Sequence, residues 1–448
     1  MPIFPDLNFS PKYLSSVTSS SKFSLVSTLS SSLYPSRLLV ILMAIALVSL
    51  APQMVSAQGN PQNPLEITET DPLLPPEANS RELTDLERRD LITALTELEQ
   101  QGNTFLEAGD FENTELAWNR LLRLSRSLGT IEEIQTLGRI GNLAWSRDLS
   151  QQVNIISTRL QRIQQEAVRR GVIAENPTPN NSTPDNSPEK LDIPLLQALG
   201  TAYQQLRSPN LAIPIYQQLL TYAQATQNIN ATENYLRTLG VLHMDWFDYT
   251  AAASTYQELF KFAVSIDDLA NQVIYLEELA YIYDQLKDQE NSIATRQELL
   301  TYYQTKLELQ PKIPSLLIEI ASSYSILRNP QAARDHYQKA YEVAIAGKLY
   351  AAARDALQGL ATLYQTYNQP DTALEIYQIL VQVNQQSYDT YFSMRAYDQM
   401  GQIHLQRSNY AQALAMFTEG LKIARTLQTQ ELYFAAQVER SRNLLSAN

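Results

Sequence analysis

The chain has 448 residues, 34 of them basic and 47 acidic, and it contains no cysteine. The lack of cysteine excludes a disulfide framework, a thiolate metal site and a cysteine nucleophile. Basic residues are outnumbered and do not cluster along the sequence, so we do not expect nucleic acid as a partner.

The first 57 residues have the features of a secretory signal peptide with a long leading region. Arg37 precedes an apolar run, residues 38–50, that is shorter than the roughly 20 residues of a membrane span. Residues 55–57 (Val-Ser-Ala) suit a cleavage site before Gln58. We therefore expect an exported mature protein, periplasmic or extracellular or in a lumenal compartment, without a stable membrane span. An uncleaved anchor and an organellar transit segment are the alternatives.

The next part of the chain is expected to be a spacer followed by two divergent helical repeats. Residues 58–83 are rich in proline and polar side chains, which favours a disordered spacer. Thr84 and Glu87 form a capping box, which predicts the start of the first helix. We expect the two repeats over residues 84–172, and the second of them has no clear register.

Residues 173–191 interrupt the helical pattern. Four prolines within this stretch exclude a continuous helix. The stretch is either a loop that bulges from an unbroken array or a linker between a two-repeat and a six-repeat block, and we favour the linker.

A pattern of small and aromatic residues then recurs six times over residues 192–428, about every 40 residues. Each copy has a small residue with an aromatic or histidine three positions later, on one helix face. A capping residue follows, and in three copies a proline comes directly after it, as at the start of a helix. Each copy therefore predicts a hairpin of two amphipathic helices. The leading small residues are Gly200, Gly240, Ala280, Ala321, Ala361 and Gly401.

A fixed period of this length predicts a stacked all-α solenoid. About eight repeats are expected in all, and residues 429–448 suit a capping helix with one polar face. Tyr283 and Tyr324 follow two of the small residues, and we expect both to be packed between helices.

These residues resemble the tetratricopeptide repeat family, in an extended variant whose period is about 40 rather than 34 residues. The family's terminal proline is mostly missing here. The resemblance implies a right-handed superhelix of antiparallel helical hairpins in which the first helix of each hairpin lines a concave groove. It also implies that the groove positions lie three residues before the small residue and one, four and five residues after it.

The candidate partner-binding groove contains mainly polar side chains. Arg237 is the only basic residue among the groove positions, and the paired Lys and Asn of the family's chaperone-binding branch are missing. Such a groove suits an extended peptide or a helix, although these positions could also be ordinary solvated helix surface. The candidate residues are Gln204, Arg237, Met244, Glu277, Tyr281, Gln285, Ser322 and Gln365.

The sequence contains no recognised catalytic or nucleotide-binding motif. His243 and His404 stand where other repeats have tyrosine, which favours a packing role. We therefore expect no enzyme, no catalytic residues, no cofactor and no metal. The expected function is that of an exported scaffold that binds a protein or peptide. The alternatives are an assembly factor that acts by self-association and a peptide sensor whose superhelical pitch changes on binding.

Overall fold

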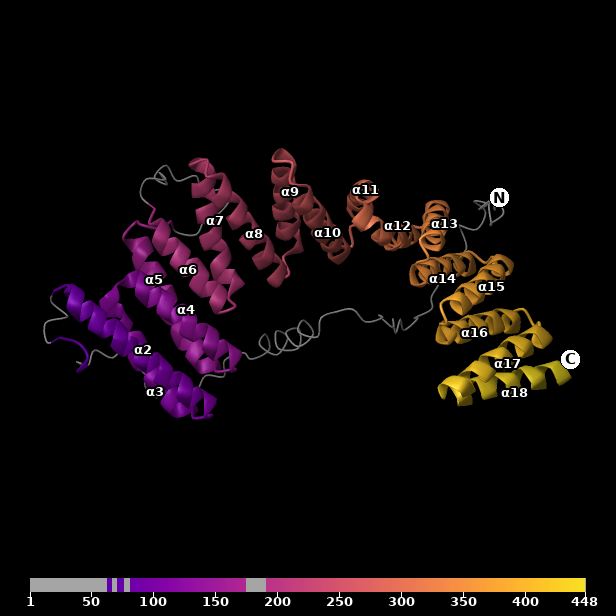
Figure 1. The fold of residues 1–448 in the computed structure, drawn as a ribbon, viewed down its shortest axis with the longest axis horizontal. Coiled ribbons are helices and arrows are strands. Elements are labelled where there is room, and N and C mark those ends of the chain that lie inside the picture. Colours follow the sequence, from indigo (N-terminus) through magenta and orange to yellow (C-terminus); the bar gives the residue numbers. More distant parts are fainter. Residues whose placement is uncertain (1–62, 67–70, 76–80, 175–190, 448) are drawn as a thin grey trace, which may run out of the picture.

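The computed structural model describes residues 63–66, 71–75, 81–174 and 191–447 (Figure 1). The signal-peptide prediction for residues 1–57 lies outside them. The described chain folds into eight antiparallel hairpins of α-helices and one closing helix. This confirms the predicted all-α solenoid of about eight repeats with a capping helix.

The bounds of the helices follow the predicted repeats closely. The first four hairpins are α2 (Asp85–Glu107) with α3 (Phe111–Ser125), α4 (Thr130–Ser146) with α5 (Ser150–Arg169), α6 (Ile193–Gln205) with α7 (Pro209–Ala225), and α8 (Ile229–Asp245) with α9 (Tyr249–Ser265). The other four are α10 (Leu269–Leu286) with α11 (Gln289–Thr305), α12 (Ile313–Ile326) with α13 (Pro330–Ala346), α14 (Tyr350–Thr366) with α15 (Pro370–Gln386), and α16 (Thr390–Gln406) with α17 (Tyr410–Leu427). Helix α18 (Glu431–Ala447) closes the array, and three short 3-10 segments complete the structure: η2 (Pro64–Glu66), η3 (Arg126–Leu128) and η5 (Leu307–Lys312).

The hairpins stack side by side along an arch that runs from α2 to α18 (Figure 1). Among helices that are not consecutive in the chain, α4 packs against α6 and α12 packs against α14. Both pairs consist of the first helices of successive hairpins. In these two places the first helices of neighbouring hairpins pack on one another, and we call the surface formed by the first helices the inner wall of the stack.

The small leading residue sets how closely the two helices of a hairpin approach. A Cβ added at Gly240 would lie 3.0 Å from the Tyr256 ring, and one added at Gly401 would lie 2.6 Å from the Phe417 ring. The aromatic side chain sixteen positions after the small residue therefore lies directly on it. This contact explains why the sequence pairs a small residue with a later aromatic in nearly every repeat.

The turns between helices share one backbone conformation. From the second hairpin onward, a residue with positive φ follows nearly every helix, and most of these residues are not glycine; Phe247 and Tyr388 are two examples, with φ of 59° and 57°. The next residue often caps the following helix, as Asp248 does by accepting a hydrogen bond from the Ala251 amide. This left-handed residue followed by a capping side chain reverses the chain within three residues.

Part of the expected disordered spacer is ordered in the structure. Leu65 in η2 is 1% exposed, and it packs into the core of the first repeats. Asp71 accepts two hydrogen bonds from Arg120 of α3, at 2.8 and 2.9 Å. The prediction of a disordered spacer is therefore wrong for residues 63–66 and 71–75, because a leucine and two carboxylates find partners far along the chain.

The stretch at residues 173–191 does not separate two blocks. Helix α4, before it, packs directly on α6, after it, and Gly138 lies against Ala202. One hydrophobic core continues from Leu65 to Leu242. The favoured interpretation as a linker between blocks is therefore wrong, and the repeats on either side form one solenoid.

The two tyrosines expected in the core differ in burial. Tyr283 is 7% exposed, and its hydroxyl accepts a hydrogen bond from Gln257. Tyr324 is only half-buried; its ring lies 5.2 Å from the His336 ring, and its hydroxyl accepts from Gln297. Tyr324 nevertheless packs against the hydrophobic core, so the expected packing holds for both tyrosines, although Tyr324 is less deeply buried.

Candidate functional site

The first helices of successive hairpins carry one row of exposed side chains, three of which, Thr201, Ser322 and Thr362, also interact with the second-helix tyrosine of their own hairpin. These residues follow the leading small residue directly, and in five successive hairpins they are exposed: Thr201, Val241, Tyr281, Ser322 and Thr362. Val241 is 51% exposed and Tyr281 is 40% exposed. The row marks the part of the wall that is open to a ligand.

Three of the eight candidate residues lie openly on this wall. Tyr281 and Ser322 belong to the exposed row, and Gln285 is exposed one turn after Tyr281. The other five candidates are half-buried and contact other side chains of the same solenoid, and their contacts assign them structural roles.

In two hairpins, the side chain four positions after the small residue hydrogen-bonds the tyrosine of the second helix. The Tyr216 hydroxyl donates to Gln204 at 2.6 Å, and the Tyr377 hydroxyl donates to Gln365 at 3.4 Å. Where the second helix carries Phe417, the matching residue is Leu405. Met244 occupies the same position in the hairpin of Tyr256 and packs against the core. Gln204 and Gln365 therefore complete their hairpins as partners of a tyrosine hydroxyl, and Met244 does so by apolar packing.

Arg237 is held between two helices of the inner wall. Its guanidinium donates to Glu233 at 2.6 and 2.9 Å and lies 5.4 Å from the centre of the Tyr275 ring in the next hairpin. Tyr275 is 3% exposed, and its hydroxyl has no hydrogen-bond partner. Burial, with the nearby charge of Glu278, raises the pKa of the neighbouring Tyr256 to about 12. Sequence reasoning missed Tyr275, which lies five positions before Ala280, the small residue of its hairpin.

Glu277 joins three helical segments. It accepts hydrogen bonds from the Tyr303 hydroxyl of α11 and from Lys312 at the end of η5, the latter at 2.9 Å. Its carboxylate therefore fixes the connection between α11 and α12, where the repeat is one residue longer than elsewhere.

Arg296 departs from the repeat pattern next to this connection. It occupies the position of Tyr216 and Tyr256 in earlier hairpins and is 5% exposed. Its guanidinium forms ion pairs with Asp284 at 2.6 Å and with Glu319 of the next hairpin at 2.8 Å. The fifth hairpin thus replaces an aromatic contact with a charged bridge to the sixth.

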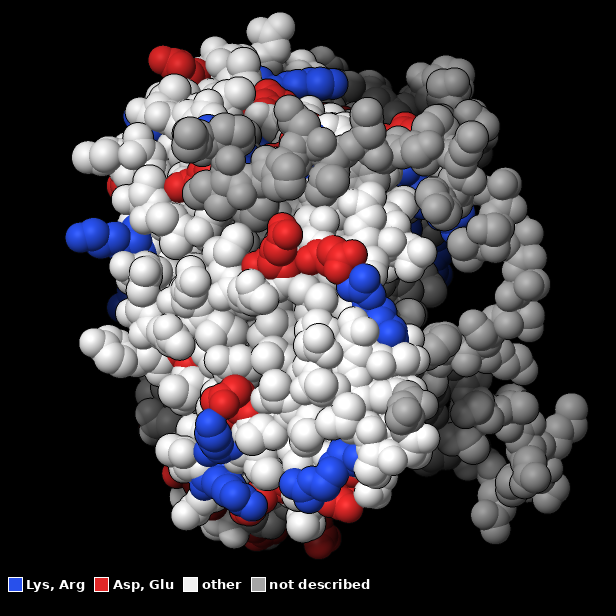
Figure 2. Space-filling view, turned by 90° about the vertical axis from the view of Figure 1, so that its right-hand side faces the viewer, with Lys and Arg blue, Asp and Glu red and all other residues white. Residues whose placement is uncertain are grey.

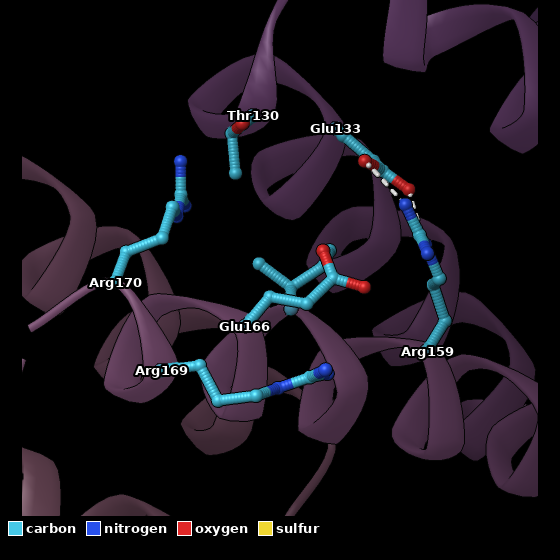
Figure 3. Close-up of a pocket in the computed structure, with 7 residues that line it drawn as sticks. Thr130, Glu133, Arg159, Glu166, Arg169 and Arg170 are labelled. Atoms are coloured by element: carbon cyan, nitrogen blue, oxygen red, sulfur yellow. Dashed lines mark hydrogen bonds and ion pairs between the residues drawn. The ribbon is translucent and has the colours of Figure 1, made fainter.

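A charged cavity of about 340 Å³ lies between the start of α4 and the end of α5 (Figure 3). Glu133 is 4% exposed and accepts two hydrogen bonds from Arg159 on one wall, at 2.7 and 3.1 Å. Glu166 points into the middle, and Arg169 and Arg170 line the opposite side (Figure 3). The arginines of α5 gave no recognised sequence motif, so sequence reasoning missed this cavity.

The described residues contain no group of three or more His, Asp or Glu side chains placed to hold a metal ion. No helix within the described ranges is both long and apolar enough to cross a membrane. On the face turned toward the C-terminal end of the arch, basic and acidic side chains lie scattered in small groups among uncharged ones (Figure 2).

The stacked hairpins, their small-residue contacts and their inner wall of first helices define a tetratricopeptide-like helical-repeat solenoid. No family model matches the sequence, and a search of curated proteins found no match. Solved structures similar to this chain include aspartyl phosphate phosphatase F from Bacillus subtilis, at 12% identity and a TM-score of 0.38, covering 81% of this chain and 80% of that one.

Two further solved structures are similar over shorter parts of this chain. The C-terminal part of a TPR repeat-containing protein from Cytophaga hutchinsonii is 12% identical with a TM-score of 0.37, covering 64% of this chain and 96% of that one. BtubC from P. vanneervenii is 16% identical with a TM-score of 0.35, covering 49% and 92%. At these identities and TM-scores the likeness carries no information on function.

Proposed function

We propose that this protein is a non-enzymatic scaffold that binds a protein or peptide along the inner wall of its solenoid. The observation that carries the proposal is the exposed row from Thr201 to Thr362, which includes Val241 and Tyr281. A row that repeats in successive hairpins matches an elongated ligand, and tyrosine is a residue type enriched among interface anchors. The hydroxyls of the row can bond to a peptide backbone.

We also propose that the scaffold acts outside the cytoplasm. The apolar run at residues 38–50 and the small residues before Gln58 support export by a cleaved signal peptide. N-terminal sequencing of the mature protein should find Gln58 at or near the first position. Recovery of a chain that still begins with Met1 would contradict export by cleavage.

The binding proposal is tested by placing a photo-crosslinking amino acid at Tyr281 in the full chain. The matched control carries the same group at Lys261, which is exposed on a second helix, α9. We expect one defined cross-linked partner from position 281 and none from position 261. Equal cross-linking from both positions, or none from position 281, would contradict the assignment of the inner wall as the binding surface.

A further inference from the structure

The short segment η2 lies against the second helices of the first two hairpins, on α3 and α5. Leu65 is buried in the core of these repeats. One backbone group is held by the surface, because Arg123 donates to the Pro64 carbonyl at 3.0 Å. Within the segment, the Asn63 side chain accepts from the Leu65 amide. The segment therefore lies on this surface as a bound peptide would, with one buried anchor and a backbone hydrogen bond.

Three arginines surround the carboxylate of Glu66. Arg162 of α5 lies 2.7 Å from Oε2, whereas Arg159 and Arg126 lie 3.8 and 3.9 Å from Oε1. Five residues further on, Asp71 pairs with Arg120 of α3. Leu65 thus fits a hydrophobic site, the Glu66 carboxylate fits a group of three arginines, and the Asp71 carboxylate fits Arg120.

The fit at Glu66 is incomplete. Glu66 Oε1 and one Arg126 nitrogen are both buried without a hydrogen bond, because the distance between them exceeds hydrogen-bonding range. Among the described residues, three arginines, Arg126, Arg159 and Arg162, lie within 4 Å of only two carboxylates, those of Glu66 and Glu133. Burial, and then repulsion from Arg159, lowers the pKa of Arg126. Beside Arg159, the cavity of Figure 3 continues the charged surface toward Arg169 and Arg170. The basic surface therefore extends beyond the arginines that Glu66 contacts, to Arg169 and Arg170.

We infer that the surface between α3 and α5 is a recognition site for an acidic, leucine-bearing peptide segment. The chain's own Leu65, Glu66 and Asp71 occupy it here, and a partner protein's segment of the same chemistry can replace them. The site lies on the second helices, so it is separate from the inner wall proposed to bind a ligand. Loss of the segment without replacement would leave half-buried arginines unpaired, which favours exchange for another acidic segment.

The test uses the full chain and a fluorescent synthetic peptide of residues 60–76. In one variant, Leu65→Ala with Glu66→Lys removes the anchor and the carboxylate from the chain's own segment. We expect this variant to bind the peptide at least ten-fold more tightly than the original chain by fluorescence anisotropy. Binding should weaken about ten-fold when Arg162→Glu is added, since the 42%-exposed Arg162 side chain pairs with Glu66 at the rim.

The matched control is a peptide carrying Glu66→Lys, which should bind the Arg162→Glu variant better than the unchanged peptide does. A variant that keeps its helical circular dichroism yet binds no peptide would overturn the inference and make η2 a fixed brace. Equal binding to the original chain and the variant would also overturn it.

Hydrogen exchange on the original chain gives an independent test. Residues 63–66 should exchange faster than α3 and α5, and exchange only on global unfolding would show that the segment cannot be displaced.

Discussion

At the scale of single residues, the clearance between a small residue and the second-helix aromatic differs among hairpins. Gly401→Ala would place a Cβ 2.6 Å from the Phe417 ring, whereas Gly240→Ala would place one 3.0 Å from the Tyr256 ring. Overpacking costs about 1–3 kcal/mol, and alanine regains about 1 kcal/mol of helix propensity. We expect Gly401→Ala to lower the free energy of unfolding by about 1 kcal/mol and Gly240→Ala to leave it nearly unchanged. Thermal melts of both variants measure this, and equal effects would contradict the packing argument.

The buried histidine of the fourth hairpin predicts a loss of stability in mild acid. His243 is 7% exposed, and burial lowers its pKa, so the folded protein keeps the imidazole neutral. In the unfolded chain a histidine binds a proton below about pH 6.5. Because the unfolded state then binds more protons, stability falls as the pH decreases from 7 to 5, by at most about 1.4 kcal/mol per pH unit.

His243→Phe should reduce this acid sensitivity, since the position carries an aromatic residue in most other hairpins. Urea unfolding at pH 7 and pH 5 gives the difference for each protein. If the Phe variant loses as much stability as the original chain, the acid response comes from other groups, such as His404, whose pKa burial also lowers.

At the scale of the helices, the fifth hairpin has an ion pair between its two helices at a place where other hairpins have a tyrosine hydrogen bond. Two other hairpins pair a second-helix tyrosine with a first-helix glutamine, Tyr216 with Gln204 and Tyr377 with Gln365, while this one pairs Arg296 with Asp284. The pair Asp284→Gln with Arg296→Tyr should therefore restore the common arrangement. We expect the double variant to unfold within about 1 kcal/mol of the original chain.

Each single substitution should cost more than the double one. Arg296→Tyr leaves the half-buried Asp284 carboxylate without its cation, at a cost of about 2 kcal/mol after allowance for its 38% exposure. A double-mutant cycle by urea unfolding should give a coupling of about 1–3 kcal/mol. Additive effects would show that Arg296 acts chiefly through Glu319 of the next hairpin.

At the scale of the whole molecule, the solenoid should survive a cut between its second and third hairpins. Leu137 and Ile140 of α4 are fully buried, and α4 packs on α6 across the break at residues 175–190. A protease site introduced between Asp185 and Asn186 should yield two fragments that elute together in size-exclusion chromatography. Separate elution of the fragments would contradict one continuous core.

The amino-acid sequence alone determined the repeat and its hairpin. Small, aromatic and capping residues recur within one or two helical turns, and such local periodicity records which helix face is buried. The positions of the six clear hairpins and of the closing helix followed from it. The first helix of each hairpin can likewise be recognised from its small residue.

Only the tertiary structure decided which groove positions are open and where the ends of the array pack. Gln204 and Gln365 belong to the hairpin interior because each bonds a tyrosine twelve residues later, on the second helix. Leu65 and Glu66 meet α3 and α5 from roughly 40 to 100 residues away in the chain, and no local period records such a contact. The packing of α4 on α6 likewise depends on two surfaces that meet only after the chain has passed residues 173–191.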